Sequence, residues 1–223
     1  MNRFFFLDQL RGLAVVWMVI FHFTYDLKVL GFIQLDMSSG FWYAFPRVIA
    51  FTFLFCVGFS SYFVHKKAVR WDFVRKRSLV LGVSALVISV STYIMFPSQW
   101  IFLGTLHCIF LGSILVAPLV RYPRLSWGLM FVILFLQYVL DYDIKWVSSL
   151  FNRPSMDFIP IYPWFWAILL GLNLAPYLSR RDYLNRFKIP GFHFLGTHSL
   201  KIYLLHQPLI FGILVLIKRV LGP

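Results

Sequence analysis

Three ionisable residues near the N-terminus have a spacing that suits acid–base chemistry and anion binding. Arg11, His22 and Asp26 share one face of an α-helix with Met18, because the intervals are seven, four and four residues and a helix has about 3.6 residues per turn. Asp26 lies one turn beyond His22 and could accept a proton from one ring nitrogen, which fixes the tautomer that a general base needs. A structural His–Asp pair that stabilises helix packing is the alternative.

Two further histidines and one arginine belong to the same chemistry. His107 and His206 lie in apolar stretches at depths similar to that of His22, and Arg47 lies near the outer end of another stretch. Each histidine alone is explained as a hydrogen-bonded packing residue, but three at one depth favour a functional site. Imidazole also suits zinc; because no spacing such as H-E-x-x-H is present, we expect no metal. We expect Arg47 to neutralise an anion or to pair with Asp26.

Polar and aromatic residues also mark two loops. Asp157 and Trp164 flank two prolines three residues apart, Pro160 and Pro163, a pattern that suits a helix start or a broken turn at the membrane interface. The interface explains the tryptophan but explains Asp157 less well. The run Arg75-Lys76-Arg77 is most simply a topology determinant that contacts lipid headgroups, and it could also meet a phosphate-bearing ligand.

The elements that position these residues must be membrane helices. Hydrophobic residues make up 60% of the 223 residues and charged residues only 13%, whereas a soluble domain has about 25% charged residues. In lipid, such a chain satisfies its backbone only as helices or a closed barrel. Continuous apolar runs near twenty residues long exclude the alternating pattern of barrel strands. We therefore predict an all-α, polytopic transmembrane helix bundle.

The predicted bundle has about seven spans within one domain, 1–223. Seven apolar stretches carry them: 10–30, 42–64, 78–96, 101–120, 125–140, 160–178 and 197–217. The fifth is the shortest. Segment 144–151 contains Lys145 and two serines, which indicates a short interfacial helix rather than a span.

The distribution of the basic residues predicts the orientation. With the N-terminus in the cytoplasm, the inner loops hold 14 of the 21 lysines and arginines and the outer loops hold six, in agreement with the positive-inside rule. The C-terminus then lies outside. A net charge of +13 would point to nucleic acid in a soluble protein. Here topology accounts for the charge, so no nucleic-acid partner is expected.

Four motifs in order give the chain a family resemblance. The opening segment 7–14 (LDQLRGLA) with His22 resembles the first helix of the transmembrane acyltransferase superfamily, and most closely the prokaryotic relatives of the heparan-α-glucosaminide N-acetyltransferase catalytic domain. Its Arg-Gly start and later histidine are also similar to acyltransferase type 3. Segments 104–109 (GTLHCI), 157–164 (DFIPIYPW) and 196–208 (GTHSLKIYLLHQP) resemble the later motifs of the family.

The resemblance implies an enzyme that moves an acetyl group from cytoplasmic acetyl-CoA to a glycan or lipid-linked acceptor at or beyond the other membrane face. It implies His22 as the catalytic general base, oriented by Asp26, with His107 or His206 as alternatives. Arg11 would bind CoA, with Arg75 and Lys76 as further candidates. Arg47, Asp157, Trp164 and His206 are candidates for acceptor binding. Better-known relatives have more spans. Some of the segments with which they bind the acceptor therefore have no counterpart in this sequence.

A small-solute transporter or channel with a path lined by His, Asp and Arg is the main alternative. Such a protein more often shows broken helices at matching positions of two halves, a pattern absent from this sequence. The expected location is the cytoplasmic membrane of a prokaryote, with membrane lipids as neighbours and a homodimer as a possible assembly.

Overall fold

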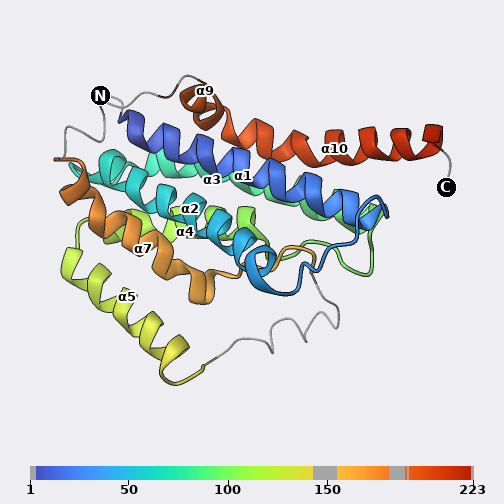
Figure 1. Cartoon of the computed structure of the whole chain (residues 1–223). Coiled ribbons are helices and arrows are strands. Elements are labelled where there is room, and N and C mark those ends of the chain that lie inside the picture. The colour runs from blue at the N-terminus through green and yellow to red at the C-terminus, as the bar shows by residue number, and fades with distance from the viewer. Residues whose placement is uncertain (1–3, 143–154, 181–188, 190, 222–223) are drawn as a thin grey trace. The chain divides into compact units, whose positions relative to one another are not determined.

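The computed structural model describes residues 4–142, 155–180, 189 and 191–221, and these residues form helices without strands. Figure 1 labels the helices in chain order. Their bounds are α1 Phe5–Val29, α2 Gly40–His65, α3 Trp71–Met95, α4 Thr105–Leu119, α5 Pro123–Tyr138, α7 Ile161–Leu178, α9 Phe192–Thr197 and α10 Ser199–Leu221. The all-α prediction is confirmed for these residues, whereas the predicted interfacial helix at 144–151 lies outside them.

Every one of the seven apolar stretches forms a helix, but the helices differ in length. Five are long and apolar enough to cross a membrane: α1, α2, α3, α7 and α10. The helices α4 and α5 contain 15 and 16 residues, fewer than the ~20 that a bilayer core needs. A count of seven spans and a cytoplasmic N-terminus therefore stay predictions.

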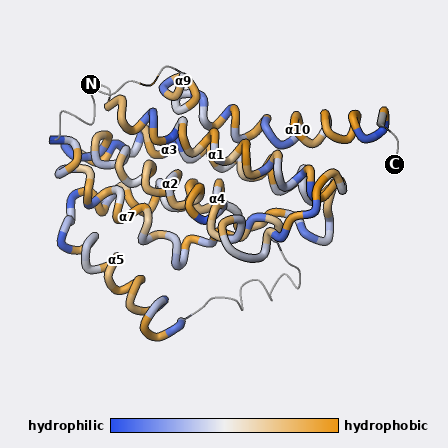
Figure 2. Tube along the Cα trace, viewed as in Figure 1, coloured by the Kyte–Doolittle hydropathy of each residue, from blue (hydrophilic) through white to orange (hydrophobic). Residues whose placement is uncertain are grey.

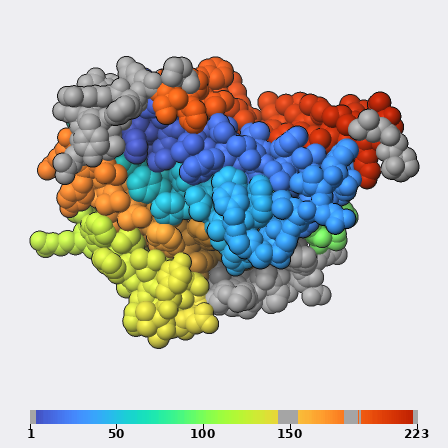
Figure 3. All heavy atoms as spheres, viewed as in Figure 1, coloured from blue at the N-terminus to red at the C-terminus, as the bar shows by residue number. Residues whose placement is uncertain are grey.

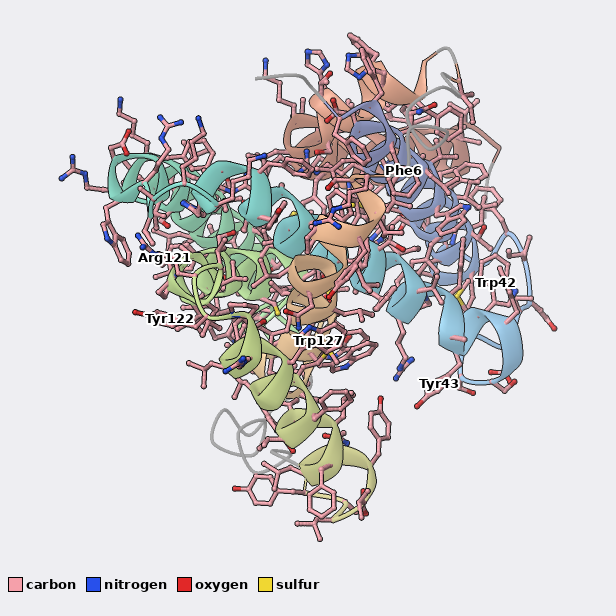
Figure 4. All side chains as sticks on the ribbon, turned by 90° about the vertical axis from the view of Figure 1, so that its left-hand side faces the viewer. Phe6, Trp42, Tyr43, Arg121, Tyr122 and Trp127 are labelled. Carbon is pink, nitrogen blue, oxygen red and sulfur yellow. The ribbon has the colours of Figure 1, made fainter. Side chains whose placement is uncertain are left out.

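Hydropathy varies along single helices as a membrane location requires. In Figure 2 the C-terminal end of α10, which carries Lys218 and Arg219, is hydrophilic, while apolar residues dominate the turns before it. Figure 4 labels Arg121 and Tyr122 in the turn between α4 and α5, with Trp127 on the first turns of α5. Charged and amphipathic aromatic side chains at helix ends are typical of the membrane–water interface.

The chain divides into two compact units. The first contains Met1–Thr52 and Asp182–Pro223, and in it α1 packs against α9 and along α10. Gly12 permits the α1–α9 contact, because a Cβ at this position would overlap the backbone carbonyl of Phe192. The second half of α10, red in Figure 3, exposes Leu209, Ile213, Leu216 and Val220, as a lipid-facing helix would.

The second unit is Phe53–Arg181 and contains the C-terminal half of α2 with α3, α4, α5 and α7. Here α4 packs on α3 and α7, and α5 packs on α7. Two glycines bring α2 and α7 into backbone contact: a Cβ on Gly58 would overlap the carbonyl oxygen of Ile168, and one on Gly171 would overlap that of Phe55. The core around this contact includes Phe59, Ile168 and Leu169, all buried.

The start of α7 agrees with the broken turn expected from its prolines. Pro160 is the N-cap residue, and Tyr162 has non-helical backbone angles inside the first turn. The segment before it runs beside residues 99–103: the backbone N–H of Ile159 donates to the Leu103 carbonyl at 2.8 Å, and that of Met156 donates to the Gln99 carbonyl at 3.0 Å. This pairing places Asp157 next to the N-terminus of α4.

Candidate active site

Asp26 and Gln207 join α1 to α10 inside the first unit. The Gln207 side-chain amide donates to both Asp26 carboxylate oxygens, with Nε2–Oδ1 and Nε2–Oδ2 distances of 2.9 and 3.1 Å. Asp26 is 2% exposed, and a carboxylate this buried needs donors to offset its lost hydration. The expected bond from His22 to Asp26 is absent among the hydrogen bonds of the described residues. The Asp26 carboxylate faces α10 instead, and the Gln207 amide is the hydrogen-bond donor that the sequence spacing had predicted to be His22.

His206 adjoins this pair and has an asymmetric hydrogen-bonding pattern. Its Nδ1 lies 2.8 Å from the Tyr203 carbonyl oxygen and 3.1 Å from that of Ile202. A carbonyl only accepts, so Nδ1 carries the hydrogen. The other nitrogen, Nε2, is buried and has no hydrogen-bond partner among the described residues.

His22 meets His206 across the α1–α10 contact. The ring centroids are 4.8 Å apart and the rings meet edge to face. His22 also touches Phe21 edge-on, and within the described part of the chain no hydrogen bond fixes its tautomer. We call His22, Asp26, His206 and Gln207 the α1–α10 cluster.

Arg11 lies about 16 Å from His22 along α1, given eleven intervening steps of 1.5 Å. Its guanidinium Nη1 is 3.5 Å from Asp8 Oδ1, and its side chain is 21% exposed. His193 of α9 approaches the other Asp8 oxygen at 3.3 Å. An arginine held by a carboxylate on a helix end is available to an anionic ligand, provided that the ligand competes with Asp8.

Arg47 of the first unit contacts a tyrosine one turn earlier in α2. Its guanidinium lies 3.7 Å from the Tyr43 ring centroid, a cation–π contact, and donates to the Tyr43 backbone carbonyl. No ion pair links it to Asp26 within the described residues. Tyr43 and its neighbour Trp42 are labelled at the start of α2 in Figure 4.

His107, in the second unit, uses both ring nitrogens. The backbone N–H of Gly104 donates to Nδ1 at 3.3 Å, and Nε2 lies 3.0 Å from the Ser89 hydroxyl. That hydroxyl donates to the Ile101 carbonyl at 2.7 Å, so it accepts from Nε2–H. The neutral ring is therefore fully bonded and has no lone pair left for a substrate.

Asp157 caps α4 in the same region. Its carboxylate accepts from the Thr105 backbone N–H at 2.7 Å and from the Thr105 hydroxyl at 3.2 Å. A carboxylate at a helix N-terminus satisfies free N–H groups and complements the helix dipole. Burial raises the pKa of Asp157, and the Thr105 hydrogen bonds partly offset this. We call Ser89, Gly104, Thr105, His107 and Asp157 the α4 cap.

The remaining predicted site residues also lie in the second unit. Trp164 is half-buried in the first turns of α7, whereas Arg75 and Lys76 are exposed near the start of α3. An exposed basic pair suits headgroup contact and phosphate binding equally well. The structure thus gathers His22, Asp26 and His206 in one cluster and His107 with Asp157 in another.

Two residues of the first unit that contact predicted site residues, Gln207 and His193, were not predicted as site residues. Gln207 lies within the last motif, and its position next to His206 in a mid-helix His-Gln-Pro run could have indicated its role. His193 had no such signal, because it belongs to the six-residue helix α9, outside the apolar stretches.

These features define a multi-pass membrane protein with ionisable groups buried between two of its helices. The family model described as "Heparan-alpha-glucosaminide N-acetyltransferase, catalytic" matches residues 3–208. The chain belongs to this acetyltransferase family, as the resemblance of its motifs predicted. No curated protein and no solved structure gives a significant match to the chain.

Proposed function

We propose that the protein transfers an acetyl group from cytoplasmic acetyl-CoA to a glycan or lipid-linked acceptor at or across the cell membrane, with a membrane-embedded histidine as general base. The observation that carries this proposal is the family match over residues 3–208. An α-glucosaminide is the acceptor named in the family description, which makes glucosamine the first acceptor to test.

The α1–α10 cluster supports the chemistry of the transfer. Attack of a hydroxyl or amine on a thioester requires a base that removes the nucleophile's proton. The cluster holds two imidazoles with ring centroids 4.8 Å apart. An ionisable residue inside a membrane span is costly and is a functional candidate by default.

The geometry of α1 supports a donor site at its N-terminal end. Arg11 is partly exposed and lies about 16 Å from His22, a span that the pantetheine arm of CoA would bridge. Its planar guanidinium matches phosphate oxygens with paired donors. Arg75 and Lys76, exposed on α3 of the second unit, stay candidates for CoA binding on the grounds of their charge alone. Arg47, Asp157 and Trp164 stay candidates for acceptor binding, although Arg47 and Asp157 already have internal partners.

Acetyl-CoA binding to the detergent-purified protein tests the proposal without an acceptor. We expect saturable binding, weakened in Arg11→Ala and unchanged in Arg47→Ala, which removes an equal charge from a residue stacked on Tyr43. Asp8→Asn should strengthen binding, because Arg11 then loses a competing carboxylate. Absence of binding by folded wild-type protein would remove the donor and would favour the transporter alternative.

A further inference from the structure

The nitrogen Nε2 of His206 is a buried acceptor that lacks a hydrogen-bond partner within the described residues. We propose that His206, rather than His22, is the general base that removes the proton from the acceptor nucleophile. This inference rests on the proposed acetyl transfer and names the base within it.

The backbone fixes the tautomer of His206. Its Nδ1–H donates to the carbonyls of Tyr203 and Ile202, one turn earlier in α10. In the neutral ring the lone pair therefore resides on Nε2. The residue is only 8% exposed, so the ring is held in place and its basic nitrogen is turned away from bulk water. A general base needs a lone pair that is held in a fixed direction and is free to accept the proton of the nucleophile, and Nε2 of His206 meets both conditions.

The neighbouring side chain shows what kind of group completes the site. Gln207 donates its amide hydrogens to Asp26, which leaves its Oε1 as a second buried acceptor without a partner in the described structure. Buried polar atoms are nearly always bonded, and two unpaired acceptors on adjacent residues can be satisfied by one bound group. Because both atoms accept, the missing group is a donor such as a hydroxyl or an amine.

His22 lacks the features that single out His206. No hydrogen bond among the described residues orients its ring, which makes ring contacts with Phe21 and His206. The expected orienting carboxylate, Asp26, is bonded to Gln207. His22 is then a positioning residue that holds the His206 ring from the α1 side.

The transfer step balances with His206 as base. The acceptor O–H or N–H donates to Nε2, and its proton moves to that nitrogen as the nucleophile forms a bond to the acetyl carbonyl carbon. The carbon–sulfur bond breaks, and its electron pair leaves on the CoA sulfur. The imidazolium returns the proton to the thiolate, giving the acetylated acceptor and free CoA.

Two asparagine variants test the assignment. In His206→Asn the amide nitrogen replaces Nδ1–H and keeps a donor for the Tyr203 carbonyl, while the base is removed. His22→Asn is the matched variant. Release of CoA thiol from acetyl-CoA is followed with glucosamine or water alone as the probe acceptor, since each must give up a proton. Acetyl-CoA Kd is measured in parallel.

We expect His206→Asn to lower kcat by about 10²–10⁴-fold and to leave the Kd for acetyl-CoA unchanged. With water as the acceptor, which does not itself titrate near neutral pH, kcat/KM of the wild type should rise with pH as the base loses its proton, and His206→Asn should lack this rise. His22→Asn should lose less activity and keep that rise. Wild-type kcat in His206→Asn, or survival of the pH-dependent rise in it, would overturn the assignment. Wild-type protein that releases no CoA would instead contradict the proposed function itself.

Discussion

His107 and His206 both lie on apolar helices next to a polar side chain from another part of the chain, yet the nitrogens of the two rings are used differently. His107 accepts from Gly104 and donates to Ser89, so both nitrogens serve the α4 cap. His206 donates to its own helix and leaves Nε2 unpartnered among the described residues. A similar predicted depth therefore does not distinguish the two histidines, whereas the hydrogen bonds of each ring do.

The largest expected effect compares catalysis in variants of the two histidines. His107→Gln places an amide donor where Nε2–H reaches Ser89, and it should retain acetyl transfer. Its kcat should exceed that of His206→Asn by at least about 10²-fold, the lower limit of general-base catalysis. CoA release by purified, folded variants measures the ratio. An equal loss of kcat in His107→Gln and His206→Asn would contradict the different roles of the two rings.

A smaller effect concerns the support of the α1–α10 cluster. Gln207→Leu leaves the Asp26 carboxylate buried without its donor, and hydrogen bonds to charged groups contribute about 1.5–3 kcal/mol. We expect a loss of this size in the free energy of unfolding in detergent. The double variant Asp26→Asn/Gln207→Leu should recover part of the loss, because it removes the charge as well. Additive losses would show that the two side chains are not coupled.

The stability of the α4 cap should respond to its histidine. His107→Ala removes two hydrogen bonds at about 1 kcal/mol each, so unfolding should become easier by about 2 kcal/mol while kcat per folded molecule stays constant. His206→Asn is the control, since it keeps the donor to the Tyr203 carbonyl and should lose little stability. A variant His107→Ala with wild-type stability and no activity would reverse the two roles.

The smallest effect is a pH dependence of the α4 cap. The pKa of Asp157 is raised in the folded protein, so its contribution to stability is full below the ordinary value of 3.8 and is lost as pH rises through the folded value. Asp157→Asn has no such titration. The stability of the wild type relative to this variant should therefore fall as pH rises, as thermal unfolding in detergent from about pH 4 to pH 8 would show. A difference in stability between the wild type and Asp157→Asn that stays constant with pH would contradict this titration.

Sequence patterns predicted the helices because hydrophobic runs are local. All seven apolar stretches correspond to helices, and the shared face of Arg11, Met18, His22 and Asp26 follows from an uninterrupted α1. The fifth stretch was already the shortest in the sequence, in agreement with the 16 residues of α5. The shortness of α4 was harder to predict, since its apolar run begins before the helix. Segment 101–104, for example, was included in the fourth run but precedes α4 as an irregular segment.

The partners of the polar residues could not be predicted, because they come from distant parts of the chain. Asp26 and Gln207 are 181 residues apart, and their bond depends on which face of α10 meets α1. Asp157 and Thr105 are 52 residues apart, brought together by pairing of two loops. Spacing alone therefore proposed the nearest partner, His22 for Asp26, whereas packing between helices selected a different one.

The paired glycines of α2 and α7 restrict how the second unit can move. Gly58 and Gly171 bring the two helices into contact through backbone atoms, and neither contributes a side chain that could change rotamer. A slide by one turn would replace them with bulkier residues and force the helices apart. The C-terminal half of α2 and α7 should therefore keep their register, so that a conformational change in the second unit would leave this contact intact.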